Sequence, residues 1–270
     1  MTLALHAPEL APIVSTLELV RAQRGAAAVR GVAPGLIVDD PAGWTPAERF
    51  ADGSALPDLL DAARERWGAS PAAAAALAWK SYVYWLTLPA VVGYAAARRI
   101  PDLSAGNVLV RLPGAAPFLQ VGLRTPAVAV APTDPVAGRY VTPVGDLPGY
   151  LRRTLVDEHL APVLDGLHQL VRVGRRTLLG SLASGVTYGL IRSADALPGP
   201  IAPTVRTLLS ALDVEDLVEI TPNLGVQRRT CCLAFTLPQP KICDGCCLPA
   251  ARSWTPVPPP GGISVQDLDG

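Results

Sequence analysis

The chain has 270 residues, of which half are hydrophobic and 17% are charged, so the composition excludes a disordered polypeptide. This length suffices for one large domain or two small ones. The 23 basic and 23 acidic residues cancel, so bulk charge points to neither nucleic acid nor an anionic membrane surface as a partner.

The first predicted elements are two helices, at residues 11–24 and 56–68, the second ended by its glycine. Residues 1–20 carry Glu9 and Glu18 and no basic leader, so they do not resemble a secretory signal. We therefore expect a cytoplasmic protein. Disulfides are rare in that compartment, and clustered cysteines there serve metal binding or redox chemistry.

A long apolar stretch follows at residues 71–99, with Lys80 near its middle. A central lysine costs about 2.5–3.5 kcal/mol on membrane insertion, and Pro89 interrupts a helix. Ser70 and Pro71 instead form a good N-cap and first-turn pair. We predict a buried helix, kinked or broken at Pro89, and no membrane span.

Residues 106–144 are rich in valine and punctuated by proline and glycine, which is typical of short antiparallel strands. The expected strands are 107–111, 118–123, 127–130 and 139–142. Helix returns from Leu147, and its apolar face, at spacings of three and four residues, comprises Leu160, Val163, Leu164, Leu167 and Val171. Two further helices are expected at 177–194 and 202–212.

These elements predict an α+β fold, with a mainly helical body, a small antiparallel sheet and a short cysteine-rich segment. The expected divisions are a body at 1–225, the cysteine-rich segment at 226–250 and a mobile Pro/Gly-rich tail at 251–270. Neither G-x-G-x-x-G after a strand nor G-x-x-x-x-G-K-[ST] occurs. The common nicotinamide, flavin and ATP sites are therefore unsupported.

All five cysteines lie between residues 231 and 247. Cys231, Cys232, Cys243 and Cys246 are spaced C-C-x10-C-x2-C, and Cys247 adjoins the last. This crowding argues against simple packing residues. A structural zinc site normally uses two separated C-x-x-C pairs, whereas one pair here is vicinal. A two-iron cluster shares four thiolates between two metals, so the spacing favours iron–sulfur, with zinc and a thiol redox pair as alternatives.

The sequence "RRTCCLAF…CDGCC" resembles the C-terminal signature of the FhuF-type ferric-siderophore reductases, in its spacing and in the preceding Arg-Arg-Thr. Upstream, "WKSYVYWLTLPAV" and "LVDEHLAPVLDGL" resemble the aromatic and central helices of that family. The family commonly has Leu-Trp-Gly-Asn in the next helix. Here Leu179 and Ser181 flank Gly180, so the tryptophan and asparagine are absent.

The resemblance implies that Cys231, Cys232, Cys243 and Cys246 bind a 2Fe-2S cluster, with Cys247 a bystander that could replace Cys246. It implies one-electron reduction of a ferric siderophore, with release of Fe(II). Because no nucleotide-binding motif is visible, the electron must come from an external ferredoxin or reductase.

Other residues are weaker candidates. Arg228 and Arg229 could favour the reduced cluster, so Arg229→Ala is predicted to lower its midpoint potential, unless both are solvated loop charges. His159, in "DEHLAP", is a weak candidate for a substrate contact, although a histidine on such a helix is more often a packing or surface residue. The arginines that could form a basic approach, or simply a solvated face, are Arg152, Arg153, Arg172, Arg175 and Arg176.

Two rival functions remain open at this point. The first is a zinc-stapled, non-enzymatic protein that binds a siderophore or another small molecule. The second is a siderophore-assembly enzyme, against which the short length and the missing nucleotide motif argue.

Overall fold

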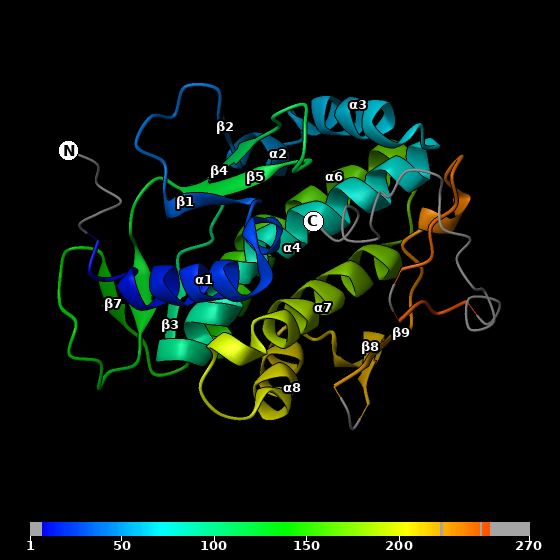
Figure 1. Cartoon of the computed structure of the whole chain (residues 1–270). Helices are drawn as coiled ribbons and strands as arrows, with labels where there is room; N and C mark the ends of the chain where they lie inside the picture. Colours follow the sequence, from blue (N-terminus) through cyan, green and yellow to red (C-terminus); the bar gives the residue numbers. More distant parts are fainter. Residues whose placement is uncertain (1–6, 222–223, 244, 249–270) are drawn as a thin grey trace.

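The computed structural model describes residues 7–221, 224–243 and 245–248 and has an α+β fold that is mainly helical, as predicted (Figure 1). The tail predicted at 251–270 lies outside these residues. The helices are α1 (Ala11–Arg24), α2 (Glu48–Ala51), α3 (Leu56–Trp67), α4 (Pro71–Ala97), α5 (Leu147–Leu151), α6 (Ala161–Val171), α7 (Arg175–Arg192) and α8 (Ile201–Ala211). A π-helical stretch, η3 (Arg152–Leu160), joins α5 to α6. Short 3-10 turns are η2 (Ala26–Ala28), η4 (Ala194–Ala196), η5 (Glu215–Leu217) and η6 (Ala234–Thr236).

Helix α4 crosses the middle of the molecule and organises the core (Figure 1). Ser70 is its N-cap, with its hydroxyl accepting a hydrogen bond from the Ala73 amide at 3.4 Å, as the sequence predicts. The helix continues unbroken through Pro89, contrary to a break at that position. Nearly every side chain from Ala73 to Tyr94 is buried, because protein elements cover the helix on all sides. No helix in the described part of the chain is long and apolar enough to cross a membrane.

Helix α7 packs along α4 at close range because glycines face the contact. A Cβ added at Gly185 would lie 3.4 Å from the Tyr84 Cα, and one at Gly189 would lie 3.1 Å from a Val91 methyl. The close approach places polar side chains of both helices next to one another. Helices α1 and α3 and strand β3 (Arg99–Pro101) also contact α4.

The strands form three small sheets. The first has the order β1-β5-β4-β2, from β1 (Val32–Ile37), β5 (Gln120–Leu123), β4 (Val108–Arg111) and β2 (Thr45–Pro46). The second has the order β3-β6-β7, with β6 (Val128–Val130) and β7 (Val141–Pro143), and the third pairs β8 (Val218–Ile220) with β9 (Val226–Arg228). The four predicted strands correspond to β4, β5, β6 and β7, but they divide between two sheets.

Two of the strand pairs are parallel, which the antiparallel prediction missed. Strand β1 pairs with β5 and β6 pairs with β7 in parallel, while the remaining pairs are antiparallel. Parallel strands cannot be joined by a tight hairpin turn, so the sequence contains no local turn signal that would predict their pairing. Strand β1 is also unusual because it contains Pro34 and Gly35, and its register shifts along β5. An edge position tolerates this proline, since its missing amide is not needed by a second neighbour.

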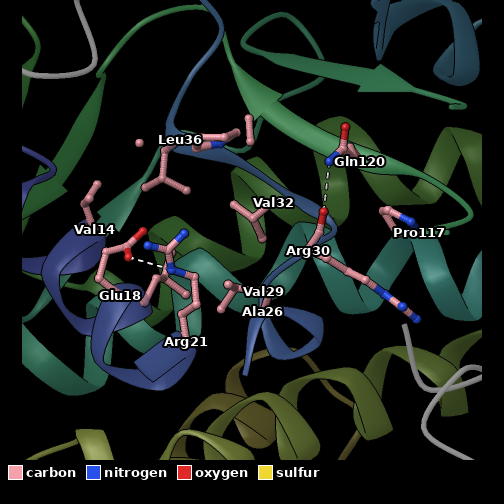
Figure 2. Close-up of a pocket in the computed structure, with 14 residues that line it drawn as sticks. Val14, Glu18, Arg21, Ala26, Val29, Arg30, Val32, Leu36, Pro117 and Gln120 are labelled. Carbon is pink, nitrogen blue, oxygen red and sulfur yellow. Dashed lines mark hydrogen bonds and ion pairs between the residues drawn. The ribbon is translucent and has the colours of Figure 1, made fainter. Parts of the chain in front are cut away.

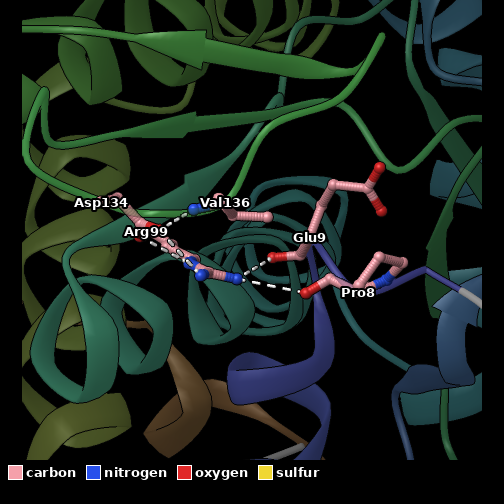
Figure 3. A network of polar contacts seen from close by, with 5 residues as sticks. All are labelled: Pro8, Glu9, Arg99, Asp134 and Val136. Atoms are coloured by element: carbon pink, nitrogen blue, oxygen red, sulfur yellow. Dashed lines mark hydrogen bonds and ion pairs between the residues drawn. The ribbon is translucent and has the colours of Figure 1, made fainter.

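A buried arginine fastens the second sheet to the start of α1 (Figure 3). The Arg99 guanidinium donates to both carboxylate oxygens of Asp134 at 2.8 and 2.9 Å, and to the carbonyls of Pro8 and Glu9 at 3.1 and 3.0 Å. Hydrogen bonding to Arg99 holds the pKa of Asp134 below its usual range. These partners compensate the buried charge of Arg99, so the network holds β3 and the residues before α1 together.

Candidate cysteine site

The cysteine-rich segment begins inside a hairpin. Strand β9 pairs with β8, and the chain then turns through η6 and returns beside β9. The Arg228 amide donates to the Gly245 carbonyl at 2.8 Å, and the Gln227 side-chain amide donates to the Cys246 carbonyl at 2.8 Å. These bonds hold the Cys243–Cys246 turn against the strand that leads to Cys231.

Two glycines let this segment pack closely. Gly245 has φ +63, and an added Cβ would lie 1.9 Å from the Val226 carbonyl oxygen. At Gly180 on α7, an added Cβ would lie 1.8 Å from the Thr230 hydroxyl oxygen. Only glycine fits at either place, so Thr230, directly before the vicinal cysteines, rests against the α7 backbone.

The structure brings the two halves of the cysteine motif together. The sulfurs of Cys232 and Cys243 are 3.6 Å apart, and Cys232 is buried with Leu77, Ala234 and Leu237. Two thiolates bound to one tetrahedral metal at about 2.3 Å would be about 3.8 Å apart. The observed separation therefore suits a shared metal.

The remaining sulfurs occupy the same neighbourhood. Burial raises the pKa of Cys231 to about 11, and the nearby Cys232, Cys246 and Cys247 add to this effect, although the Leu233 amide donates to the Cys231 sulfur at 3.3 Å and opposes it. Burial and Cys246 likewise raise the pKa of Cys247. Even so, the described residues contain no group of three or more His, Cys, Asp or Glu side chains arranged to hold a single metal ion.

The thiol of Cys232 differs from its neighbours. The hydrogen bond between the Cys232 and Cys243 sulfurs lowers the pKa of Cys232, and the charges of Lys80 and Arg228 lower it further against the opposing effect of burial. The same bond raises the pKa of Cys243. The site thus favours negative charge on sulfur at Cys232, which is the form that binds metals.

Arg228 is the feature of the site that spacing alone does not reveal. Its side chain is only 2% exposed, and its Nη1 lies 3.9 Å from the Cys243 sulfur. Its Nε and Nη2 have no hydrogen-bond partner among the described residues. Burial alone would lower the pKa of Arg228, but Cys232 and Cys243 raise it. A buried cation with unpaired donors is costly unless an anion lies beside it.

The donor set and this arginine together fit a 2Fe-2S cluster. Such a cluster with four thiolates is an anion of formal charge about −2, and its ligands divide between two irons. In such a cluster no single point would have to collect all four sulfurs. Cys231, Cys232, Cys243 and Cys246 would hold the cluster, and the unpaired donors of Arg228 would face its charge.

The other predicted site residues are placed differently. Arg229 is about half exposed, and its Nη2 lies 3.6 Å from a Glu219 carboxylate oxygen. His159 is fully buried, with its Nδ1 2.6 Å from the Leu103 carbonyl oxygen and its Nε2 2.6 Å from the Tyr82 hydroxyl. In this position His159 does not face solvent, so a docked chelate would not reach it.

The arginines considered as a basic approach mostly form exposed ion pairs with carboxylates. Arg152 pairs with Asp213, Arg153 with Glu158, Arg175 with Asp165 and Arg176 with Asp216. This pairing is what a solvated helical face displays. Because carboxylates neutralise these arginines, this face has little net positive charge to attract an anion.

A hollow of about 290 Å³ lies between α1, η2 and β1 (Figure 2). Its wall is largely apolar, including Val14, Val29 and Val32, and at its edge Glu18 pairs along α1 with Arg21 at 2.9 Å. None of its lining residues comes from the cysteine-rich segment. We therefore do not assign it to the chemistry of the cysteines.

Neither a protein-family model nor a curated protein matches this chain.

Proposed function

We propose that the protein is a cytoplasmic iron–sulfur oxidoreductase that reduces ferric siderophores. The observation that carries the proposal is the pair of sulfurs from Cys232 and Cys243 beside the buried guanidinium of Arg228, whose Nε and Nη2 have no hydrogen-bond partner among the described residues. This combination supports an anionic metal cluster over isolated thiols. The resemblance to FhuF-type reductases supports the same assignment.

When bound, the cluster would supply a one-electron carrier between an external ferredoxin or reductase and the iron(III) chelate. The protein's part is electrostatic and protective. Arg228 and Lys80 supply positive charge near the sulfurs, and the apolar contacts of Leu77 and Leu237 keep water from Cys232. Cys231, Cys243 and Cys246 remain partly exposed, so one side of the site stays accessible to partners.

The substrate chemistry needs no acid, base or nucleophile. Hard oxygen donors bind Fe(III) more tightly than Fe(II), because the attraction increases with the charge of the metal. One electron therefore loosens the complex without cutting a bond of the chelator. A reaction that needs only one electron agrees with a site of this composition. The site contains cysteines and cations, and the described residues include no triad-like grouping.

The test is anaerobic purification followed by iron, sulfide and zinc analysis. We expect iron and acid-labile sulfide in equal amounts, visible absorption, and a paramagnetic signal after reduction. Reduced protein should then lose this signal when mixed with ferric chelates, with Fe(II) trapped by a colorimetric chelator. A colourless protein containing zinc would contradict the proposal and favour a zinc-stapled binding protein.

A further inference from the structure

The sulfurs of Cys232 and Cys243 are held together by the backbone around them. They lie 3.6 Å apart. The Lys241 amide donates to the Ala234 carbonyl at 3.1 Å, which closes the loop between the two cysteines. The hydrogen bond from β9 to the Gly245 carbonyl holds the chain on the other side of the pair. Bonds of the protein itself therefore keep the two thiols close, whether or not a metal binds them.

A disulfide between these sulfurs requires only a short movement. An S–S bond is about 2.0 Å long, so the two sulfurs must approach each other by about 1.6 Å. Cys232 is packed in a buried group with Leu77 and Leu237, whereas Cys243 is partly exposed and follows the exposed residues 238–240. We therefore expect the chain at Cys243 to make most of the movement.

The difference in exposure also assigns the order of the chemical steps. A small-molecule disulfide such as glutathione disulfide reaches the partly exposed Cys243, but it does not reach Cys232, which is only 2% exposed. The Cys243 thiolate attacks one sulfur of glutathione disulfide, which forms a mixed disulfide and releases one glutathione thiolate. The Cys232 thiolate then attacks the Cys243 sulfur and releases the second glutathione. The protein loses two electrons and two protons, and glutathione disulfide gains them.

This pairing differs from the one that the spacing of the cysteines favours. Cys243 and Cys246 form a C-x-x-C pair, the usual arrangement of a thiol redox couple. The structure places the Cys243 sulfur against Cys232, which belongs to the vicinal pair. A disulfide is therefore expected between the two halves of the motif and not within the C-x-x-C pair.

On the basis of the proposed function, we infer that loss of the cluster lets Cys232 and Cys243 form a reversible disulfide that closes the metal site. Both thiolates are ligands in the loaded protein, so the disulfide and the cluster exclude each other. Disulfides in the cytoplasm are mostly transient and redox-sensing, which agrees with a reversible bond. The disulfide also protects both sulfurs from irreversible oxidation to sulfinic acid. The site is reloaded only after reduction.

The test uses the full chain, freed of its cluster by an iron chelator and a thiol reductant under argon and then desalted. Glutathione disulfide is added, and free thiols are alkylated before digestion and mass spectrometry. Trypsin separates the vicinal cysteines, in residues 230–241, from the other three, in residues 242–252. We expect two of the five thiols to escape alkylation, the two peptides to be joined, and fragmentation to place the bond between Cys232 and Cys243.

Reloading and variants supply the controls. The oxidised protein should take up no iron and sulfide until dithiothreitol is added, and the loaded protein should show no joined peptides after the same treatment. Cys232→Ser and Cys243→Ser should each lose this bond, whereas Cys247→Ser, the matched control, should keep it. Because the bond is located in the unmodified protein, a variant that misfolds does not decide the outcome.

A bond within residues 242–252, a link through other cysteines, or five alkylated thiols would overturn the inference. Iron analysis of the purified protein separates this result from the proposed function. If the bond forms but the protein contains no iron, the disulfide assignment stands and the reductase proposal fails. If the cluster is present but its loss leaves five free thiols, only the disulfide assignment fails.

Discussion

At the scale of single residues, the site depends on a buried positive charge. Arg228 is surrounded by protein and faces two sulfurs, whereas its neighbour Arg229 is exposed and pairs with Glu219. A charge in a buried position interacts more strongly than a solvated one, because less water screens it. The two adjacent arginines therefore have different roles, which their sequence positions do not distinguish.

Replacing Arg228 with glutamine is expected to lower the midpoint potential of the cluster by about 100 mV, because a nearby buried charge is worth about 2.3 kcal/mol for one electron. Protein-film voltammetry measures this shift. Arg228→Lys should keep most of the potential, since it keeps the charge. Arg229→Ala should lower it much less, as its charge is solvated and paired. Equal shifts for Arg228→Gln and Arg229→Ala would contradict the distinction.

The adjacent thiols Cys246 and Cys247 allow a second comparison. The Cys246 amide donates to the Cys243 carbonyl at 3.1 Å, a turn that brings the two ends of the C-x-x-C pair together. Cys246→Ser is therefore expected to lose most of the bound iron and the visible absorption, while Cys247→Ser keeps both. Iron and sulfide analysis of the two variants shows which of the two cysteines is the ligand. If Cys247→Ser alone loses its iron, Cys247 is the ligand in place of Cys246.

At the scale of elements, the contact between α7 and the segment carrying the vicinal cysteines is made through Gly180. Alanine is normally about 1 kcal/mol better than glycine inside a helix. Here the added methyl would collide with Thr230, and overpacking of this kind costs about 1–3 kcal/mol. The collision acts on the residue directly before Cys231.

We therefore expect Gly180→Ala to lower the free energy of unfolding by about 1–2 kcal/mol and to reduce the iron content. Denaturant titration and metal analysis measure the two effects. Gly145→Ala is the control, because no atom lies within 4 Å of its added Cβ and its backbone is not in the left-handed region. A Gly180→Ala protein as stable and as iron-rich as the parent would show that this contact does not support the site.

At the scale of the whole molecule, local signals in the sequence predict more than long-range ones. Ser70 and Gly68 correctly mark the start of α4 and the end of α3, because capping depends on residues within one turn. Strand β1 escapes prediction, since Pro34 and Gly35 suggest a turn and its partner β5 lies far along the chain. The same holds for the site: cysteine spacing is local, but the burial of Arg228 and the approach of Lys80 arise only from tertiary packing.

His159 links three parts of the molecule, and its environment predicts how stability depends on pH. The Leu103 carbonyl can only accept, so Nδ1 carries the proton and Nε2 accepts from the Tyr82 hydroxyl. Burial lowers the pKa of His159 to about 4. In the unfolded chain His159 binds a proton below about pH 6.5, whereas in the folded protein it stays neutral down to about pH 4. The free energy of unfolding therefore falls as the pH decreases from about 6.5 to about 4.

Between pH 7 and pH 5 this histidine alone should remove about 2 kcal/mol from the free energy of unfolding. Urea titrations of the parent protein and of His159→Gln at both pH values measure the difference. The variant should be less stable at pH 7, because it repacks a buried hydrogen-bonded group, yet lose about 2 kcal/mol less on acidification. An equal loss in both proteins would mean that other groups cause the acid sensitivity and that the buried imidazole does not link core packing to pH.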